Sequence, residues 1–332
     1  MRVGPYQMNL VFVHFAKRIP RYLLNNLEHT VQKFPEHKVW LVTSKDTTFN
    51  GISGLYKFEY NPIGEWHYIA DKLSHPAEFR DGFWLKSLGR FVALKEFIKF
   101  NSSELLHIES DVILSKDFPF SELTQNNADI AFPIVSPTQG IASILYLRNQ
   151  QIAENLVKHA IDSVTLENSS TDMTILFSFW KNGKEKTSIL PIGPMKNIDH
   201  VKCKENYSGY FDGLDYGYYL FGEDPRNNRG FTKSHQKLEN YFFNVANQVI
   251  VYSNERHFLN VYDFDEMVFK PVYSLHIHSK NPKLFKAHLL ERKLKLQIDK
   301  LELPPSKVLF INVAILQILQ AIQRRTRNIV GN

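Results

Sequence analysis

The stretch LLHIESDVILSKDFPF, residues 105–120, decides how the first half of the chain folds. It begins with a largely apolar run, stops at Glu109 and Asp111, and continues with three further apolar residues. A short apolar run that is closed by polar residues predicts a buried strand. Side chains two apart on a strand point to the same side, so both carboxylates are expected to converge on one point.

Strands and helices alternate on both sides of this stretch. Before it, the hydrophobic spacing predicts three strands and two helices, at residues 9–14, 38–44 and 55–60 and at residues 20–34 and 83–101. After it, the spacing predicts two strands, two helices and two late strands, at residues 128–135 and 140–149, 150–164 and 172–183, 248–253 and 271–279. Looser structure is expected at residues 64–82 and in the Gly-, Tyr- and Asp-rich residues 184–233. This order predicts an α/β domain with a largely parallel sheet.

The composition is that of a soluble globular protein. The 332 residues suffice for one large domain or two ordinary ones, with 43% hydrophobic and 22% charged residues. The single cysteine, Cys203, permits no disulfide within the chain. The first apolar run is short and is followed by Lys17 and Arg18, without the long apolar region and cleavage site of a signal peptide. We therefore expect a cytoplasmic protein.

The formal net charge of +6 leaves nucleic acid, an anionic membrane and phosphate-bearing substrates open as partners. Lysine and arginine are spread along the chain and mixed with acidic residues, which argues against nucleic acid. The tail is different, because residues 308–322 are mostly apolar with one narrow polar stripe, and three arginines follow. It is too short to span a bilayer. It predicts either an amphipathic helix on the inner face of an anionic membrane or a helix docked on the core or another subunit.

Glu109 and Asp111 are candidate metal ligands. Two carboxylates that converge repel one another, and a divalent cation removes that repulsion. Mg²⁺ and Mn²⁺ prefer oxygen ligands and are often shared with substrate phosphates. The pair therefore predicts a metal that in turn holds a diphosphate. The plain alternative is the beginning of a surface loop, in which Lys116 pairs with the acids.

His276 and His278 are also two apart on an expected strand, and neutral imidazole is a ligand for Mn²⁺. Of the two, His278 is favoured as the metal ligand because it lies nearest the strand end. Lys280 follows and is a candidate contact for phosphate. The alternative is a pair of structural histidines.

Other candidates lie on the helices and in the glycine-rich stretch. Lys86 and Arg90 are four apart on one helix face, where they would neutralise a diphosphate or simply face solvent. Asp172 stands near a helix start, as a cap or as a contact for acceptor hydroxyls. Asp212 is the first choice for a base that deprotonates an acceptor hydroxyl, and Asp215 is a second candidate in the same stretch. A loop aspartate that binds its own backbone is the alternative.

The segment HIESDVIL, residues 107–114, resembles the D-x-D strand end of metal-dependent GT-A glycosyltransferases. The helix that carries Trp84, Lys86 and Arg90 resembles the one that approaches the sugar nucleotide in these enzymes. The resemblance continues through several later segments and covers residues 5–285, as DIAFP, SILYLRN, SSTDMTIL, YFDGLDYGYYLFGEDPRN and LHIHSKNPK.

The resemblance implies a single GT-A (Rossmann-like) domain with a mixed, mostly parallel sheet, followed by a helical tail. Residues 1–140 would form the nucleotide-sugar-binding half, residues 141–285 the acceptor-side half, and residues 286–332 the tail, which would associate with a membrane. The implied activity is that of a hexosyltransferase in polysaccharide biosynthesis. It would move a sugar from a nucleotide-sugar donor to a hydroxyl of a glycan or lipid-linked acceptor, with Mn²⁺ or Mg²⁺ as cofactor.

The resemblance also implies a set of site residues. The implied metal ligands are Glu109, Asp111, His276 and His278. The implied nucleotide-sugar contacts are Trp84, Lys86, Arg90, Ser110 and Lys280. Two departures stand out: Glu109 replaces the usual aspartate, and the late segment lacks the complete histidine-glycine-lysine pattern of the family that includes lipopolysaccharide galactosyltransferases. That family is therefore not assigned.

Two other functions compete with the glycosyltransferase hypothesis. The tyrosine-rich stretch suits a carbohydrate- or phosphate-binding module without catalysis. His276, His278 and an acid also suit a two-histidine, one-carboxylate iron oxygenase. Such oxygenases are β-rich barrels, and the α/β order of this chain argues against that fold.

Overall fold

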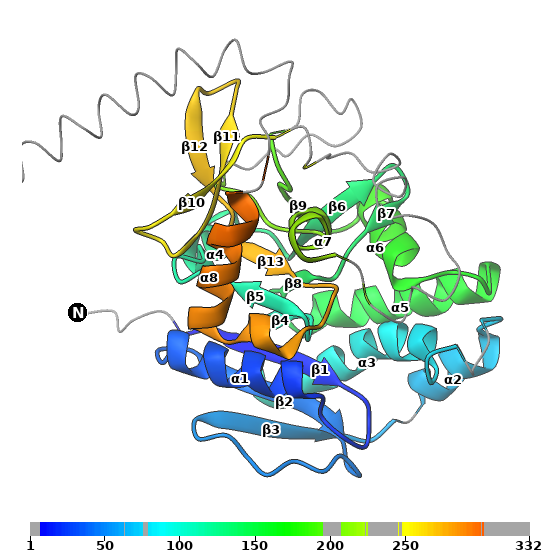
Figure 1. The fold of residues 1–332 in the computed structure, drawn as a ribbon. Coiled ribbons are helices and arrows are strands. Elements are labelled where there is room, and N and C mark those ends of the chain that lie inside the picture. Colours follow the sequence, from blue (N-terminus) through cyan, green and yellow to red (C-terminus); the bar gives the residue numbers. More distant parts are fainter. Residues whose placement is uncertain are drawn as a thin grey trace, which may run out of the picture.

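A mixed β-sheet forms the centre of the fold (Figure 1). The structure, a computed structural model, describes residues 7–62, 64–75, 79–194, 207–222, 224, 245, 248–299 and 301. The strands of the sheet lie in the order β3 (Leu55–Tyr60), β2 (Lys38–Ser44), β1 (Asn9–His14), β4 (Leu105–Ile108), β8 (Ile144–Leu147), β6 (Ile130–Ser136) and β7 (Gln139–Gly140), with β9 (Thr187–Leu190) beside β6. Strands β3, β2, β1 and β4 are parallel, whereas β8 runs antiparallel to both neighbours. The α/β fold with a mixed, mostly parallel sheet is thus confirmed.

Helices cover both faces of this sheet because its strands alternate their apolar side chains between two cores. Val11 packs on one face with α3 (Phe83–Asn101), α5 (Gln150–Leu166) and α6 (Asp172–Lys181), next to α2 (Glu65–Lys72). Leu10 and Phe12 pack on the other face, against α1 (Arg21–Lys33), and α4 (Phe120–Gln125) lies at the edge of the same core. Burial of each such side chain contributes roughly 2 kcal/mol.

A smaller layer brings the late part of the chain to the main sheet. Strand β13 (Ser274–His276) pairs antiparallel with β5 (Val112–Leu114), which directly follows the turn after β4. Around this pair a third core gathers, from the elements α7 (Asp215–Phe221), α8 (Ala287–Ile298), the 3-10 helix η4 (Pro282–Phe285) and the sheet of β10 (Ile250–Ser253), β11 (Phe258–Asp263) and β12 (Val268–Pro271). This pairing brings residues 274–276 beside residues 112–114, so the late part of the chain lies next to the turn after β4.

The strands and helices expected from hydrophobic spacing are present, with bounds within a few residues of the prediction. The expectation of looser structure was wrong for residues 65–72, which form α2, and for the parts of residues 184–233 that form β9 and α7. Aromatic residues of α7 supply its packing surface: Tyr216, which precedes Gly217, is fully buried. Tertiary burial therefore overrides the low helix propensity of this segment.

The C-terminal part is described only at its beginning. Helix α8 forms the start of the expected helical tail, whereas residues 302–332, on which the membrane prediction depends, lie outside the described residues, as does Cys203. Among the helices that are described, none has the length and apolar character that crossing a membrane requires.

Candidate active site

The carboxylates of Glu109 and Asp111 lie on the tight turn between β4 and β5. The N–H of Glu109 donates to the carbonyl of Ser143 at 3.0 Å, and the N–H of Val112 donates back to the carbonyl of Glu109 at 3.0 Å. On the far side, the N–H of Ile277 donates to the carbonyl of Asp111 at 2.8 Å. The turn is therefore fixed by the main sheet on one side and by the end of β13 on the other.

Asn26 of α1 holds this turn from below, a role that the sequence did not reveal. Its side-chain Nδ2 donates to the carbonyls of Ser110 at 3.1 Å and Val112 at 2.8 Å, and the residue is 1% exposed. The hydroxyls of Tyr22 and Ser110 are 3.2 Å apart. The one available signal was an asparagine on the apolar face of a helix, between Leu23 and Leu27.

Replacing Asn26 by alanine is expected to lower the free energy of unfolding by about 2 kcal/mol, because two buried carbonyls lose their donor. The same change frees the turn and is expected to weaken Mn²⁺ binding. Denaturant unfolding and Mn²⁺ titration of the variant measure both effects. Gln32→Ala, at an exposed position of the same helix, is the control. Equal stability of Asn26→Ala and wild type would show that Asn26 does not hold the turn.

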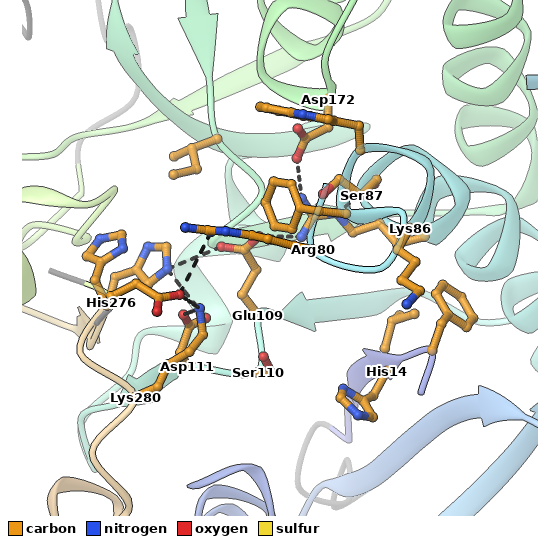
Figure 2. A pocket seen from close by; sticks show the side chains of 18 of the residues that line it. His14, Arg80, Lys86, Ser87, Glu109, Ser110, Asp111, Asp172, His276 and Lys280 are labelled. Atoms are coloured by element: carbon orange, nitrogen blue, oxygen red, sulfur yellow. Dashed lines mark hydrogen bonds and ion pairs between the residues drawn. The ribbon is translucent and has the colours of Figure 1, made fainter. Parts of the chain in front are cut away.

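Three ligand-type side chains meet at the turn (Figure 2). Glu109, Asp111 and His276 each offer an atom within 4.8 Å of the others. Nε2 of His276 lies 3.5 Å from a carboxylate oxygen of Glu109 and 3.4 Å from one of Asp111. All three groups are largely buried, so their interactions are little weakened by water.

The orientation of His276 suits a metal ligand. Its Nδ1 lies 2.7 Å from the carbonyl oxygen of Gly213, and because that oxygen only accepts, Nδ1 carries the hydrogen. The other nitrogen, Nε2, therefore faces the carboxylates, as in histidines that bind metals. Burial alone would lower the pKa of His276, but Asp111 and Glu109 raise it to about 9. The two carboxylates thus favour the protonated form of the ring.

The backbone of His276 is locked by Asp212 and Gly217. The Asp212 carboxylate accepts the N–H groups of His276 at 2.8 Å, Gly217 at 2.9 Å and Tyr216 at 3.1 Å. A Cβ atom at Gly217 would lie 1.8 Å from the carbonyl oxygen of His276, so only glycine allows α7 to approach β13 this closely. The position of His276 at the end of β13 thus depends on Asp212 and α7, which lie in the residues where looser structure was expected.

His278 lies behind His276 rather than among the carboxylates. The two rings stack with centroids 3.9 Å apart, and Nε2 of His278 lies 3.2 Å from the carbonyl of Leu214. Burial, followed by the neighbouring His276, lowers the pKa of His278 well below its ordinary value. The sequence favoured His278 as ligand, but among the described residues it is His276 that completes the cluster with Glu109 and Asp111.

The cluster fits a divalent cation. Burial raises the pKa of both carboxyls. For Glu109, the nearby Arg90 and His276 outweigh burial and lower the pKa below its ordinary value. For Asp111, Lys280 and His276 do the same. Both acids are therefore ionised at neutral pH. Two carboxylates and one imidazole nitrogen are ligands that Mn²⁺ accepts, and Mg²⁺ accepts the oxygens.

Arg90 has a different partner from the one expected. Its guanidinium forms ion pairs with Glu109 through Nη1 and with Asp172 through Nη2, and its Nε donates to the carbonyl of Ser87 at 3.0 Å. Burial lowers the pKa of Arg90, but the carboxylates of Glu109 and Asp172 raise it by more, so the pKa lies above its ordinary value. The cation is thus engaged between two acids, and its fork links α6 to the turn after β4.

The predicted catalytic aspartates divide into two groups. Asp172 lines the central cavity, and the N-cap of α6 is Thr171 rather than Asp172. Burial raises the pKa of Asp172, although Arg90 opposes this rise. Asp212 and Asp215 are buried and lie outside the cavity lining. Burial, and then Asp212, raises the pKa of Asp215 well above its ordinary value.

A cavity of about 560 Å³ opens beside the cluster, a size typical of small-molecule sites. The predicted contacts Trp84, Lys86, Ser110 and Lys280 all line it. Trp84 stacks on His75, with centroids 4.9 Å apart and an interplanar angle of 26°. The cavity therefore joins an aromatic face, several cations and the carboxylate cluster in one space.

Comparisons with known proteins add likenesses of fold. No protein-family model matches the sequence, and no curated protein matches it. The galactosyltransferase LgtC, solved with donor and acceptor sugar analogues, matches 90% of this chain and 99% of its own at 12% identity and a TM-score of 0.44. Mouse xyloside xylosyltransferase 1 matches 59% of this chain and 89% of its own at 8% identity and a TM-score of 0.37.

A third solved structure, the PaToxG glycosyltransferase, matches 53% of this chain and 68% of its own at 11% identity and a TM-score of 0.37. All three are glycosyltransferases by name. With TM-scores below 0.5, these likenesses identify neither the reaction nor its residues.

Proposed function

We propose that this protein is a GT-A glycosyltransferase of the hexosyltransferase type. It moves a sugar from a nucleotide-sugar donor to a hydroxyl of a glycan or lipid-linked acceptor. The observation that supports this proposal is the cluster of Glu109, Asp111 and His276 at the wall of a cavity that also holds Lys86 and Lys280. Carboxylates that hold a cation, next to ammonium groups, form a site for a diphosphate.

Mn²⁺ or Mg²⁺ would be held by Glu109, Asp111 and His276. When bound, such an ion supplies positive charge that stabilises a departing diphosphate. Lys280 and Lys86 line the cavity, where their ammonium groups bind phosphate oxygens. Glu109, Asp111 and His276 are already clustered before the substrate enters, so the ligands of the cation need little reorganisation during the reaction.

The other cavity residues orient the substrate. Arg90 holds the carboxylates of Glu109 and Asp172 at fixed positions, so that Asp172 presents its carboxylate to a substrate hydroxyl. The face of Trp84 packs on the donor, because aromatic rings bind bases and sugars by stacking. Asp212 acts on the site through the backbone of His276 and is a positioning residue.

The remaining parts of the proposal rest on the sequence. We propose that residues 1–140 bind the donor and residues 141–285 the acceptor, in polysaccharide biosynthesis on the cytoplasmic side of a membrane that the tail contacts. The iron oxygenase alternative is not proposed, because the described chain forms an α/β sheet and because His278 lies away from the carboxylates.

Calorimetric titration tests the proposed function. Purified protein is titrated with UDP, GDP and CMP, each in the presence of Mn²⁺ and again with EDTA. We expect one nucleotide to bind with Mn²⁺ and to lose most of its affinity with EDTA, since its phosphates need the ion. Binding of free sugars with no nucleotide binding under any condition would favour the non-catalytic carbohydrate-binding module instead.

A further inference from the structure

Lys280 occupies a place on one of the candidate metal ligands. Its ammonium Nζ lies 2.9 Å from Oδ2 of Asp111 (Figure 2). The same Nζ lies 3.4 Å from Oδ2 of Asp224. The lysine side chain is 23% exposed, whereas each aspartate side chain is 7% exposed. Lys280 is therefore the most exposed of the three side chains.

The same carboxylate faces two side chains at once. Its Oδ1 faces Nε2 of His276 at 3.4 Å, while its Oδ2 faces the ammonium of Lys280. The backbone keeps both side chains near, because Lys280 follows His276 by one short turn. In that turn the N–H of Lys280 donates to the carbonyl of Ile277 at 3.1 Å, with a left-handed φ of 50°. The ammonium of Lys280 thus occupies one oxygen of Asp111, and His276 faces the other.

A divalent cation on Asp111 would meet Lys280 as a like charge across one carboxylate. Repulsion between such charges in a buried site is stronger than in water. Two groups can take the ammonium away from Asp111: Asp224, already 3.4 Å from Nζ, and an anion that enters the cavity. The charge of Asp224 is already shared with Arg80, whose Nη1 lies 3.9 Å from Oδ2 of Asp224. A diphosphate offers more negative charge than Asp224 does.

We propose that Lys280 is an exchangeable counter-ion. It neutralises Asp111 while the site is empty and turns to the diphosphate when the divalent cation and the nucleotide enter together. The two ligands therefore bind cooperatively, and each raises the affinity of the other by the same factor. This inference rests on the proposed function and adds to it a regulation of the same site: the metal alone binds weakly.

The test compares Lys280→Met with wild type, both as the full chain. Free Mn²⁺ is followed by electron paramagnetic resonance, first with protein alone and then with saturating UDP or GDP. Lys283→Met, an exposed lysine of η4, is the matched control. In wild type we expect the nucleoside diphosphate to raise Mn²⁺ affinity roughly tenfold or more.

In Lys280→Met we expect Mn²⁺ alone to bind at least roughly threefold more tightly than in wild type, because its competitor is gone. The enhancement by UDP or GDP is expected to shrink severalfold, and Lys283→Met is expected to match wild type. Lys280→Gln, which also lacks the charge, repeats the measurement if the methionine variant does not fold.

Two results would overturn the inference, and they separate it from the proposed function. If wild type binds Mn²⁺ and a nucleotide but Lys280→Met binds Mn²⁺ alone no more tightly, the counter-ion exchange is wrong and the transferase proposal stands. If wild type binds neither Mn²⁺ nor any nucleotide, both fail together.

Discussion

Replacing Arg90 by methionine is expected to lower the free energy of unfolding by about 4 kcal/mol, measured by denaturant unfolding in EDTA. The guanidinium is buried between Glu109 and Asp172 and forms ion pairs with both. Removing one partner of a buried ionic group leaves the other charge without compensation, which costs more than the ion pair itself contributes. The free energy of unfolding of Arg90→Lys is expected to lie between those of wild type and Arg90→Met, because one ammonium cannot pair with both carboxylates as the guanidinium does.

The control for this prediction is an exposed ion pair. Lys158 and Asp162 are 2.8 Å apart on α5, with side chains 76% and 55% exposed. Lys158→Met is expected to change the free energy of unfolding by less than about 0.5 kcal/mol, because water screens this pair. If Arg90→Met were as stable as Lys158→Met, the two buried carboxylates would not depend on Arg90, and the link between α6 and the turn would be wrong.

Replacing Asp111 by asparagine is expected to reduce sugar transfer by about 10³-fold while the fold stays intact. Asparagine keeps the shape of the side chain but removes the charge that holds both the cation and Lys280. The assay is the release of nucleoside diphosphate from the nucleotide sugar whose base the titrations identify. Mn²⁺ affinity, measured separately, is expected to fall in parallel with the rate.

Asp117→Asn is the control for Asp111→Asn. Asp117 lies a few residues further along the chain, is half-exposed, and pairs only loosely with Arg256 at 3.4 Å. We expect its variant to transfer sugar at the wild-type rate. Unchanged turnover in a folded Asp111→Asn variant would remove Asp111 from the proposed metal site.

Much of the fold followed from the sequence because local patterns carry it. The strands at residues 9–14, 38–44 and 55–60 were predicted with the bounds that the structure has. The first two are short, mostly apolar runs, and in the third apolar and charged residues alternate. Glu109 and Asp111 do lie close together, as their spacing predicted, but they stand on the turn between β4 and β5 and not on a strand. Features that depend on one short segment alone could therefore be predicted from the sequence.

The rest depends on contacts between distant segments. His276 reaches the carboxylates because β13 pairs with β5 so that His276 faces Val112, and no local pattern records that register. Because His276 and His278 are two residues apart, they were expected on one side of a strand. However, β13 ends at His276, and after the following turn the ring of His278 lies behind that of His276. The engagement of Arg90 with Glu109 and Asp172 was hidden for the same reason.

The most direct test of the metal site is an anomalous-diffraction map from crystals grown with Mn²⁺ and the nucleotide that calorimetry selects. We expect one strong Mn²⁺ peak within bonding distance of Glu109, Asp111 and His276, with Lys280 turned from Asp111 toward the diphosphate. A Mn²⁺ peak at other residues, or nucleotide bound with no Mn²⁺ at this cluster, would show that these three residues are not the metal site.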